Sequence, residues 1–268
     1  GARGITFPAL FAEYAKGYRE RYGLGEETLA RMLASAAALC YRNGLENPLA
    51  HFGRGGPSDK LGLTTAEAIL TLPAEKNPMI AEPLRLHDCS LVTDGAAALV
   101  IVGPDHPAGK GGRAVRIAGI GHAAERMAIA KRENMHELKA AKAAAAAAYA
   151  EAGLTAADVD IAEVHDCFTI NQLLCTEALG LSADGRAGHD YLEGRFGPTD
   201  RVSVNLSGGL KAKGHPVGAT GVSMHALLYK QLVGEPIGQA PVKTPRVGVS
   251  LNVGGSAATN CVSILVRD

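Results

Sequence analysis

From Leu91 onward, short apolar runs alternate with alanine-rich or sparsely charged runs, and this order constrains the fold more than any other feature. The apolar runs predict strands at residues 96–102, 114–120, 159–164, 202–205, 247–251 and 258–266, and the others predict helices at 135–153, 168–181 and 217–232. This order predicts an α/β fold: a mixed, mostly parallel sheet with helices on both faces. Sites in such sheets lie beyond the carboxyl ends of the strands.

The first ninety residues have a different character. Helical spacing of apolar residues predicts helices at 8–22 and 26–41. Residues 47–83 are rich in proline, glycine and charge and show little periodicity, which indicates a partly looped segment. We therefore expect a largely helical part at residues 1–90 and an α/β part at 91–268.

Composition and charge exclude several classes of function. The chain of 268 residues is 47% hydrophobic, with 33 glycines and no tryptophan, which suits an α/β protein with tight turns. Its 27 basic and 27 acidic residues give zero net charge, so neither nucleic acid nor a membrane surface is indicated as a partner. The ends carry no recognisable address, and we expect a cytoplasmic location.

The five cysteines are widely spaced and odd in number, which does not suit a secreted disulfide framework. No CxxC pair is present, so we expect no structural zinc and no other metal site. Cys175 and Cys261 are expected in the core, and Cys40 falls in the second predicted helix.

His165, Asp166, Cys167 and Phe168 follow a predicted strand and precede a predicted helix. A helix N-terminus favours negative charge and lowers the pKa of a thiol, so Cys167 could exchange protons or act as a nucleophile. The alternative is structural, with Cys167 as a small buried residue and Asp166 as a helix cap. Spacing alone does not decide between these interpretations.

A second motif places His215 among five glycines at residues 205–221, again before a predicted helix. Glycines let a ligand approach the backbone, whose N–H groups can bind an oxyanion or a phosphate. The motif is neither a Walker loop nor a dinucleotide fingerprint. The alternative, a glycine-rich turn with a solvated histidine, explains fewer of its residues.

Two further motifs are weaker. Asn252, Gly254 and Gly255 lie between two predicted strands, which by itself indicates only a hairpin. His87, Asp88 and Cys89 repeat the letters of residues 165–167 but precede no helix, and we interpret them as supporting structure.

Together these motifs resemble the sterol-carrier-protein-2 (SCP2) type of the thiolase superfamily. The resemblance rests on His-Asp-Cys-Phe at 165–168, Gly-Gly-Leu-Lys-Ala-Lys-Gly-His-Pro-Val-Gly-Ala-Thr-Gly at 208–221 and Asn-Val-Gly-Gly at 252–255. Residues 6–11 and 47–51 look like the family's loop domain. The resemblance thus implies a thiolase-like fold, with a loop domain at 1–90 and the C-terminal half at 91–268. Residues 91–103 would be the last strand of the N-terminal half.

The resemblance also implies roles for individual residues. His215 would form part of an oxyanion hole and activate a nucleophilic thiol, and His165 would stand near the position of a water-orienting asparagine. Cys167 would be the acid–base group, because Asn252 occupies the place where other thiolases have a second cysteine. The Gly254 N–H would complete a second oxyanion hole. We expect Gly209, Gly214 and Phe168 to contact the substrate.

The implied activity is acyl transfer on β-ketoacyl-CoA, with the coenzyme A thioester as substrate and no cofactor. The implied partners are acyl-CoA and CoA, a second copy in a homodimer, and a zinc-ribbon/OB-fold subunit of the kind that some SCP2-like thiolases bind. Two alternatives stay open: an SCP2-like aldolase that forms no acyl-enzyme, and a non-catalytic acyl-CoA-binding subunit.

The family's acyl-accepting cysteine belongs to the N-terminal half, and this chain resembles only the loop domain and the C-terminal half. Cys40 is the nearest imitation, but its predicted helix is not the setting that the family uses. The predicted helices at 168–181 and 217–232 are apolar on most faces, so a half-fold would leave apolar surface uncovered. We therefore expect the N-terminal half to be absent here, and to come from another chain or from residues not included in this sequence.

Overall fold

The computed structural model describes residues 6–107 and 113–267. The helices are α1 (Phe7–Tyr22), α2 (Glu26–Gly44), α3 (Pro57–Lys60), α4 (Ala66–Leu70), α5 (Lys139–Ala152), α6 (Thr169–Ala178), α7 (Ala187–Leu192), α8 (Gly209–Lys213) and α9 (Thr220–Leu232). The strands are β1 (Met79–Ala81), β2 (Leu84–Arg85), β3 (Val115–Ala124), β4 (Ile161–Val164), β5 (Ser203–Val204), β6 (Val247–Gly254) and β7 (Thr259–Arg267). Every predicted helix has a counterpart, and so does every predicted strand except the one at 96–102.

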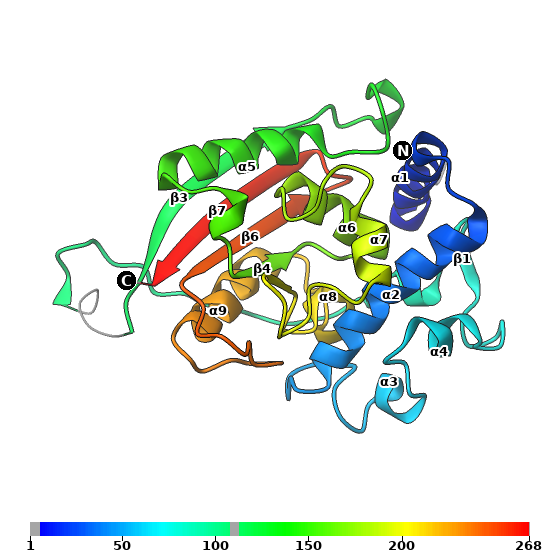
Figure 1. Ribbon diagram of the computed structural model, residues 1–268, viewed down its shortest axis with the longest axis horizontal. Coiled ribbons are helices and arrows are strands. Elements are labelled where there is room, and N and C mark those ends of the chain that lie inside the picture. Colours follow the sequence, from blue (N-terminus) through cyan, green and yellow to red (C-terminus); the bar gives the residue numbers. More distant parts are fainter. Residues whose placement is uncertain (1–5, 108–112, 268) are drawn as a thin grey trace.

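Five strands form the central sheet in the order β3–β7–β6–β4–β5 (Figure 1). β4 runs parallel to β5 and β6, whereas β7 is antiparallel to both β6 and β3. The predicted mixed α/β sheet is confirmed, but only half of its pairings are parallel. β7 is antiparallel to β6 because the two strands are joined by a short turn, whereas parallel strands need a long crossover connection.

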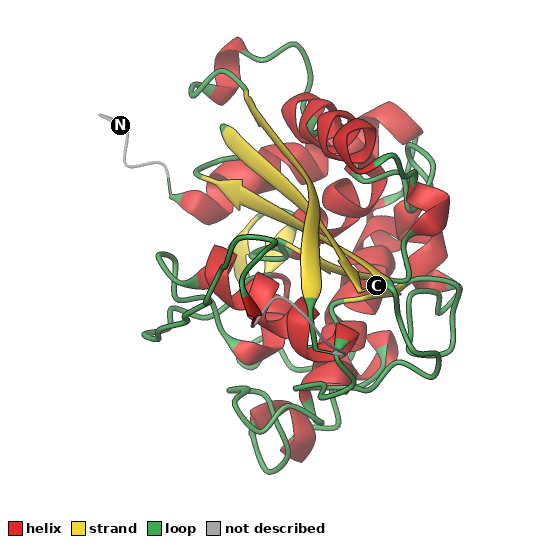
Figure 2. Ribbon diagram, turned by 90° about the vertical axis from the view of Figure 1, so that its left-hand side faces the viewer, coloured by secondary structure: helices red, strands yellow, loops and turns green. Residues whose placement is uncertain are grey.

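Helices cover both faces of this sheet, as predicted (Figure 2). Gly248, Leu265 and Ile161 point to the side of α9, where they meet Leu228 and Leu232. The alternate residues Val249 and Ile264 belong to the core on the other side, together with the alanines of α5. Period-two alternation along buried strands therefore supplies two apolar faces.

The close approach of α5 to β3 depends on two glycines. A Cβ at Gly119 would lie 2.2 Å from the Ala148 carbonyl oxygen, and one at Gly121 would lie 1.8 Å from that of Ala144. Only glycine on the strand and alanine on the helix leave room for this contact. The alanine tract of α5 is thus a packing feature as well as a good helix former.

The N-terminal helices share the core of the sheet. Phe11, Tyr14 and Tyr18 of α1 are buried in the same apolar cluster as α6 and strands β4, β6 and β7. The Tyr18 hydroxyl donates to the buried Glu177 carboxylate of α6 at 2.7 Å. The boundary at residue 90 stays a prediction.

The strand predicted at 96–102 is absent, and this prediction is wrong. These residues have irregular backbone, and the side chains of Val100 and Ile101 are 92% and 72% exposed. A strand needs a neighbour for its N–H and C=O groups, and the described part of the chain offers this run none. An apolar run that should be buried is therefore left uncovered.

No helix within 6–107 or 113–267 is long and apolar enough to cross a membrane.

Candidate active site

Three segments meet at the carboxyl ends of β4 and β6, where the sequence predicted a site. His165 directly follows β4, Asn252 lies near the end of β6, and His215 lies in the turn between α8 and α9. The two imidazole rings are 5.0 Å apart between centroids and nearly perpendicular, at 89°. The structure therefore brings together these three predicted residues.

The His165 side chain is buried and held by Asn252. Its Nδ1 lies 2.9 Å from the Asn252 amide oxygen, which can only accept, so Nδ1 carries the hydrogen. Its Nε2 is left as an acceptor. Burial, and secondly the neighbouring His215, lower the pKa of His165 to about 3. The ring is therefore neutral at physiological pH.

His215 is half-buried and held by two threonines. Its backbone N–H donates to the Thr93 hydroxyl at 3.1 Å, and its Nδ1 lies 2.7 Å from the Thr220 hydroxyl. That hydroxyl donates to the Pro216 carbonyl at 3.1 Å, so Nδ1 is the donor and Nε2 is again an acceptor. Burial, and then the ammonium of Lys213, lower the pKa of His215 to about 4. Sequence reasoning missed Thr93, Thr220 and Lys213, although two of them lie in the motif at 208–221.

Asp166 connects the two histidine segments. Its buried carboxylate accepts the N–H groups of Leu210 and Lys211 at 2.7 and 3.1 Å, so it caps α8 and not α6. Gly209 makes this approach possible, because a Cβ there would lie 2.1 Å from the Asp166 Oδ2 atom and φ is +60°. Substrate contact by Gly209 stays a prediction.

Cys167 differs from its prediction in one respect. The side chain is 7% exposed and packs in the main apolar cluster, and Sγ makes no hydrogen bond to His165 or His215. Burial first, and then the Asp166 carboxylate, raise the pKa of this thiol well above its usual range. The predicted lowering by a helix N-terminus is wrong, because loss of water outweighs the dipole of the ten-residue α6. A neutral thiol is a proton donor, so an acid role for Cys167 stays a prediction.

Cys40 is fully buried, which removes it as a nucleophile. Its Sγ lies 3.3 Å from an Asp166 carboxylate oxygen and 3.4 Å from the Gln172 side-chain oxygen, and its single hydrogen serves one of these acceptors at a time. Burial raises the pKa of this thiol well above its usual range. Cys175 is buried as predicted, whereas Cys261 is exposed on β7, opposite Asn252, and its predicted burial is wrong.

The other predicted residues lie around this centre. Gly254 ends β6, and its carbonyl accepts the Ala258 N–H at 3.1 Å. Gly214 has φ of +120°, and a Cβ there would lie 2.8 Å from the His51 ring. Phe168 stacks on Phe11 with ring centroids 4.5 Å apart. Contact of these residues with an oxyanion or a substrate stays a prediction.

An open cleft of about 450 Å³ lies beside His215. Its walls are residues 93–97 on one side and Pro216–Ala219 with Val222 on the other. Within the described ranges, no group of three or more His, Cys, Asp or Glu side chains is placed to hold a metal ion.

Comparison with known proteins identifies the family. Residues 121–267 match the family model described as thiolase C-terminal domain-like. The chain belongs to the thiolase superfamily. It is 35% identical over 265 residues to an acetyl-CoA acetyltransferase of Methanothermobacter thermautotrophicus, covering 99% of this chain and 64% of that protein.

Two further likenesses refine this thiolase assignment. Sterol carrier protein 2 of Oryctolagus cuniculus is 31% identical over 260 residues, covering 94% of this chain and 44% of that protein, which supports the SCP2-type branch. A solved structure described as Ltp2-ChsH2(DUF35) aldolase has the same fold, with a TM-score of 0.78 at 20% identity, covering 100% of this chain and 65% of that one. This thiolase chain therefore spans less than two thirds of the length of each.

Proposed function

We propose that this chain supplies the acid–base and oxyanion-binding half of a thiolase-type site that acts on β-ketoacyl-CoA. The observation that carries the proposal is the His165–His215 pair, neutral and nearly perpendicular, held by Asn252 and Thr220. Both imidazoles have Nε2 available as an acceptor, which suits proton transfer with a thiol.

The proposed cleavage uses His215, Gly254 and Cys167 directly, while the neutral His165 ring packs against His215. A nucleophilic cysteine gives its proton to Nε2 of His215 and attacks the keto carbonyl of the substrate. The carbonyl oxygen becomes an oxyanion, stabilised by the imidazolium and the Gly254 N–H. When the bond between Cα and Cβ breaks, the acetyl-CoA carbanion takes a proton from the Cys167 thiol. CoA then gives its thiol proton to the Cys167 thiolate and attacks the acyl-cysteine. The new thioester forms as the nucleophilic cysteine leaves with the proton of the His215 imidazolium, which restores each group.

The nucleophile has to come from outside this chain. Burial raises the pKa of the Cys40, Cys167 and Cys175 thiols, which favours the neutral proton donor over an attacking thiolate. Cys89 and Cys261 make no hydrogen bond to either histidine. The cleft next to His215 is open, and its lining residue Val217 is exposed. Val100 and Ile101, which follow the lining segment 93–97 in the chain, are exposed as well. A further polypeptide segment that covers these apolar side chains would bring the thiol. We expect it in the native assembly, meaning this chain together with the polypeptide that completes the site.

Acyl trapping tests the proposal. The native assembly is incubated with a β-ketoacyl-CoA, and its peptides are analysed by mass spectrometry. We expect an acylated cysteine outside this chain, absent in Cys167→Ala and retained in the control Cys261→Ser. Cys167→Ala should lose C–C cleavage, whereas Cys261→Ser should keep it. Full cleavage by Cys167→Ala would refute its role as the acid.

An SCP2-like aldolase is the second candidate, favoured by the lack of a suitable thiol among the described residues. A retro-aldol cleavage needs proton transfer but no acyl-enzyme. The solved relative is described as an aldolase together with a DUF35 component, so a partner subunit belongs to this alternative. Cleavage of a β-hydroxyacyl-CoA without any acylated cysteine would establish it, and acyl-CoA binding without turnover would indicate a non-catalytic subunit. A homodimer and a cytoplasmic location stay predictions.

A further inference from the structure

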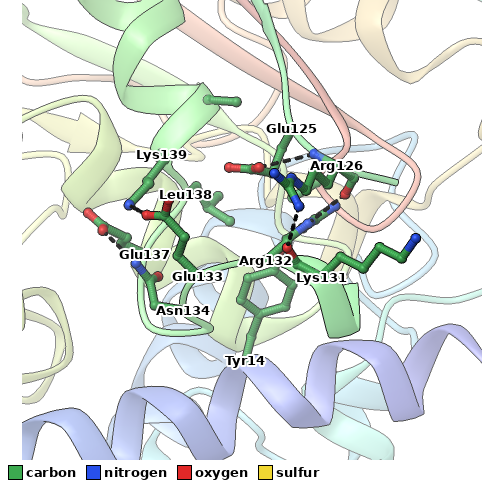
Figure 3. Close-up of a pocket in the computed structure, with 12 residues that line it drawn as sticks. Tyr14, Glu125, Arg126, Lys131, Arg132, Glu133, Asn134, Glu137, Leu138 and Lys139 are labelled. Carbon is green, nitrogen blue, oxygen red and sulfur yellow. Dashed lines mark hydrogen bonds and ion pairs between the residues drawn. The ribbon is translucent and has the colours of Figure 1, made fainter. Parts of the chain in front are cut away.

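A second cavity, of about 120 Å³, lies between α1, the segment at 125–140 and the turn after β6 (Figure 3). Tyr14 reaches into this region from α1, with Arg126, Lys131 and Arg132 on one side and Glu133, Glu137 and Lys139 on the other. Glu125, Asn134, Leu138, Ala140 and Ala257 complete the lining. The proposed acyl-transfer chemistry uses none of these residues.

Arg132 is the central polar group of this cavity. Its Nη1 donates to the Ser256 carbonyl at 2.6 Å and to the Tyr14 hydroxyl, and its Nε donates to the Arg126 carbonyl at 2.8 Å. Its Nη2 is buried and has no hydrogen-bond partner within the described residues. A guanidinium fixed on two sides with an unused nitrogen is suited to an added carboxylate oxygen.

The charges around the cavity also favour an anion. Glu133 forms an ion pair with Lys139, and Glu137 forms one with Lys142 at 2.7 Å. Glu125 accepts the backbone N–H of Arg126 at 3.0 Å.

Three cationic side chains at the cavity have no carboxylate partner among the described residues. Arg126, Lys131 and Arg132 form no ion pair within 4 Å in the described parts of the chain. Because Glu125 is the one lining carboxylate without a cationic partner in those parts, the unpaired charge at the cavity is positive.

Two series of neighbouring residues connect the cavity with the candidate site. Phe168, next to Cys167, stacks on Phe11, whose ring is 5.7 Å from that of Tyr14. Ser256, which accepts from Arg132, comes two residues after Gly254. Arg132 is therefore linked to the proposed reaction centre through Tyr14 on one side and through the turn after β6 on the other.

We propose that this cavity binds the carboxylate at the far end of an acyl chain, so that the preferred substrate is an ω-carboxyacyl-CoA. Arg132 receives the carboxylate after a small rotation of its guanidinium. Leu138, Ala140 and Ala257 contact the last methylene groups. This specificity rests on the proposed function of the His165–His215 site.

The test compares two β-ketoacyl-CoA substrates of equal chain length, one ending in a methyl group and one in a carboxylate. In the native assembly, kcat/KM should be at least about tenfold higher for the carboxylate. Arg132→Gln should lower kcat/KM for the carboxylate substrate about 10- to 100-fold and leave the methyl substrate within about threefold. The control, Arg19→Gln, removes an exposed ion pair of α1 with Glu26 and should change neither value.

A second variant and a direct binding measurement keep the outcome decisive. If Arg132→Gln does not fold, Arg132→Lys keeps the charge but not the planar fork, and should lose most of the preference. Equal use of both substrates by the wild type, or an equal loss of both in a folded Arg132 variant, overturns the specificity.

Calorimetry with free glutarate separates this inference from the proposed function. If the wild type turns over neither substrate, the proposed function fails. If the wild type then binds glutarate and Arg132→Gln does not, the cavity is still a carboxylate site. If the wild type does not bind glutarate, the carboxylate site is refuted. Glutarate binding without a preference between the two acyl-CoA substrates would assign the cavity to a free acid and overturn the proposal.

Discussion

Two segments of this chain share the letters His-Asp-Cys, at 87–89 and 165–167, yet only one faces the candidate reaction centre. His165 follows a buried strand and meets the ring of His215. His87 lies in a short 3-10 turn, and its Nδ1 is 2.7 Å from the Tyr41 hydroxyl. The difference lies in the neighbour of each histidine: His165 meets the glycine-rich segment that carries His215, whereas His87 meets Tyr41 of α2.

The two segments also lie side by side. Cys89 and Phe168 form an antiparallel bridge, and the Ser90 N–H donates to the Cys167 carbonyl at 2.8 Å. Asp88 accepts from the Thr169 hydroxyl at the start of α6. The segment at 87–89 thus supports the one at 165–167, which agrees with its predicted structural role.

The largest expected effect is on activity. His215→Gln should lower kcat of the native assembly about 10²- to 10⁴-fold, because it removes the nitrogen that accepts the thiol proton. His165→Gln should lower kcat at least about 10²-fold, because it removes the neutral ring that packs against His215. His87→Gln is the matched control and should stay within about threefold. Steady-state assays with a β-ketoacyl-CoA would measure kcat of the three variants. An equally large loss of kcat in His87→Gln would contradict the different roles of the two segments.

The next effect is on stability. Asp166→Ala should lower the free energy of unfolding by about 3 kcal/mol, because it leaves two buried N–H groups of α8 without their acceptor. Asp88→Ala should cost less, about 2 kcal/mol, since it removes one hydroxyl contact and the Arg85 N–H. Urea denaturation would give both values. A larger loss in Asp88→Ala would reverse the order.

Local pattern was enough to predict most of the sheet and the position of its site. Short apolar runs located β3, β4, β6 and β7, and the strand-to-helix transitions placed His165 and His215 at the ends where sites form. His215 was recognised because it lies in the fourteen-residue motif at 208–221, and so long a motif fits few other structures.

Properties set by distant neighbours could not be predicted. The run at 96–102 was apolar enough for a buried strand, but pairing depends on a partner that the described chain lacks. Cys261 lies on the same face of β7 as Leu265 but nearer the start of the strand, where it is exposed, so its apolar setting did not ensure burial. The pKa of Cys167 is decided by loss of water in the packed core, which a helix N-terminus in the sequence does not reveal.

A smaller effect concerns pH and should be similar in the two segments. Burial lowers the pKa of His87 to about 4 and that of His165 to about 3, against about 6.5 in the unfolded chain. Between pH 4 and 6.5 the unfolded state therefore binds more protons, so this contribution to stability is complete above pH 6.5 and is lost as pH falls. The raised pKa values of Asp88 and Asp166 act in the opposite direction.

His87→Gln and His165→Gln should each flatten the pH dependence of unfolding in this range. We expect roughly 0.5–1 kcal/mol per pH unit for each, allowing for solvent screening. Urea midpoints at pH 5, 6 and 7 would measure the slopes. Flattening in only one variant would show that the two imidazoles differ in burial as well as in neighbours.

The smallest effect is on thiol reactivity, and it bears directly on Cys167. In a Cys261→Ser background, which removes the exposed thiol, iodoacetamide should modify Cys89 about tenfold faster than Cys167 at pH 8. Cys89 is partly exposed, although burial raises its pKa to about 12, so both thiols should react far more slowly than free cysteine. Timed alkylation and then peptide mass spectrometry give the two rates. Faster modification of Cys167 would mean that its thiol reaches the open cleft as a thiolate. The proton of the proposed cleavage would then have to come from another group.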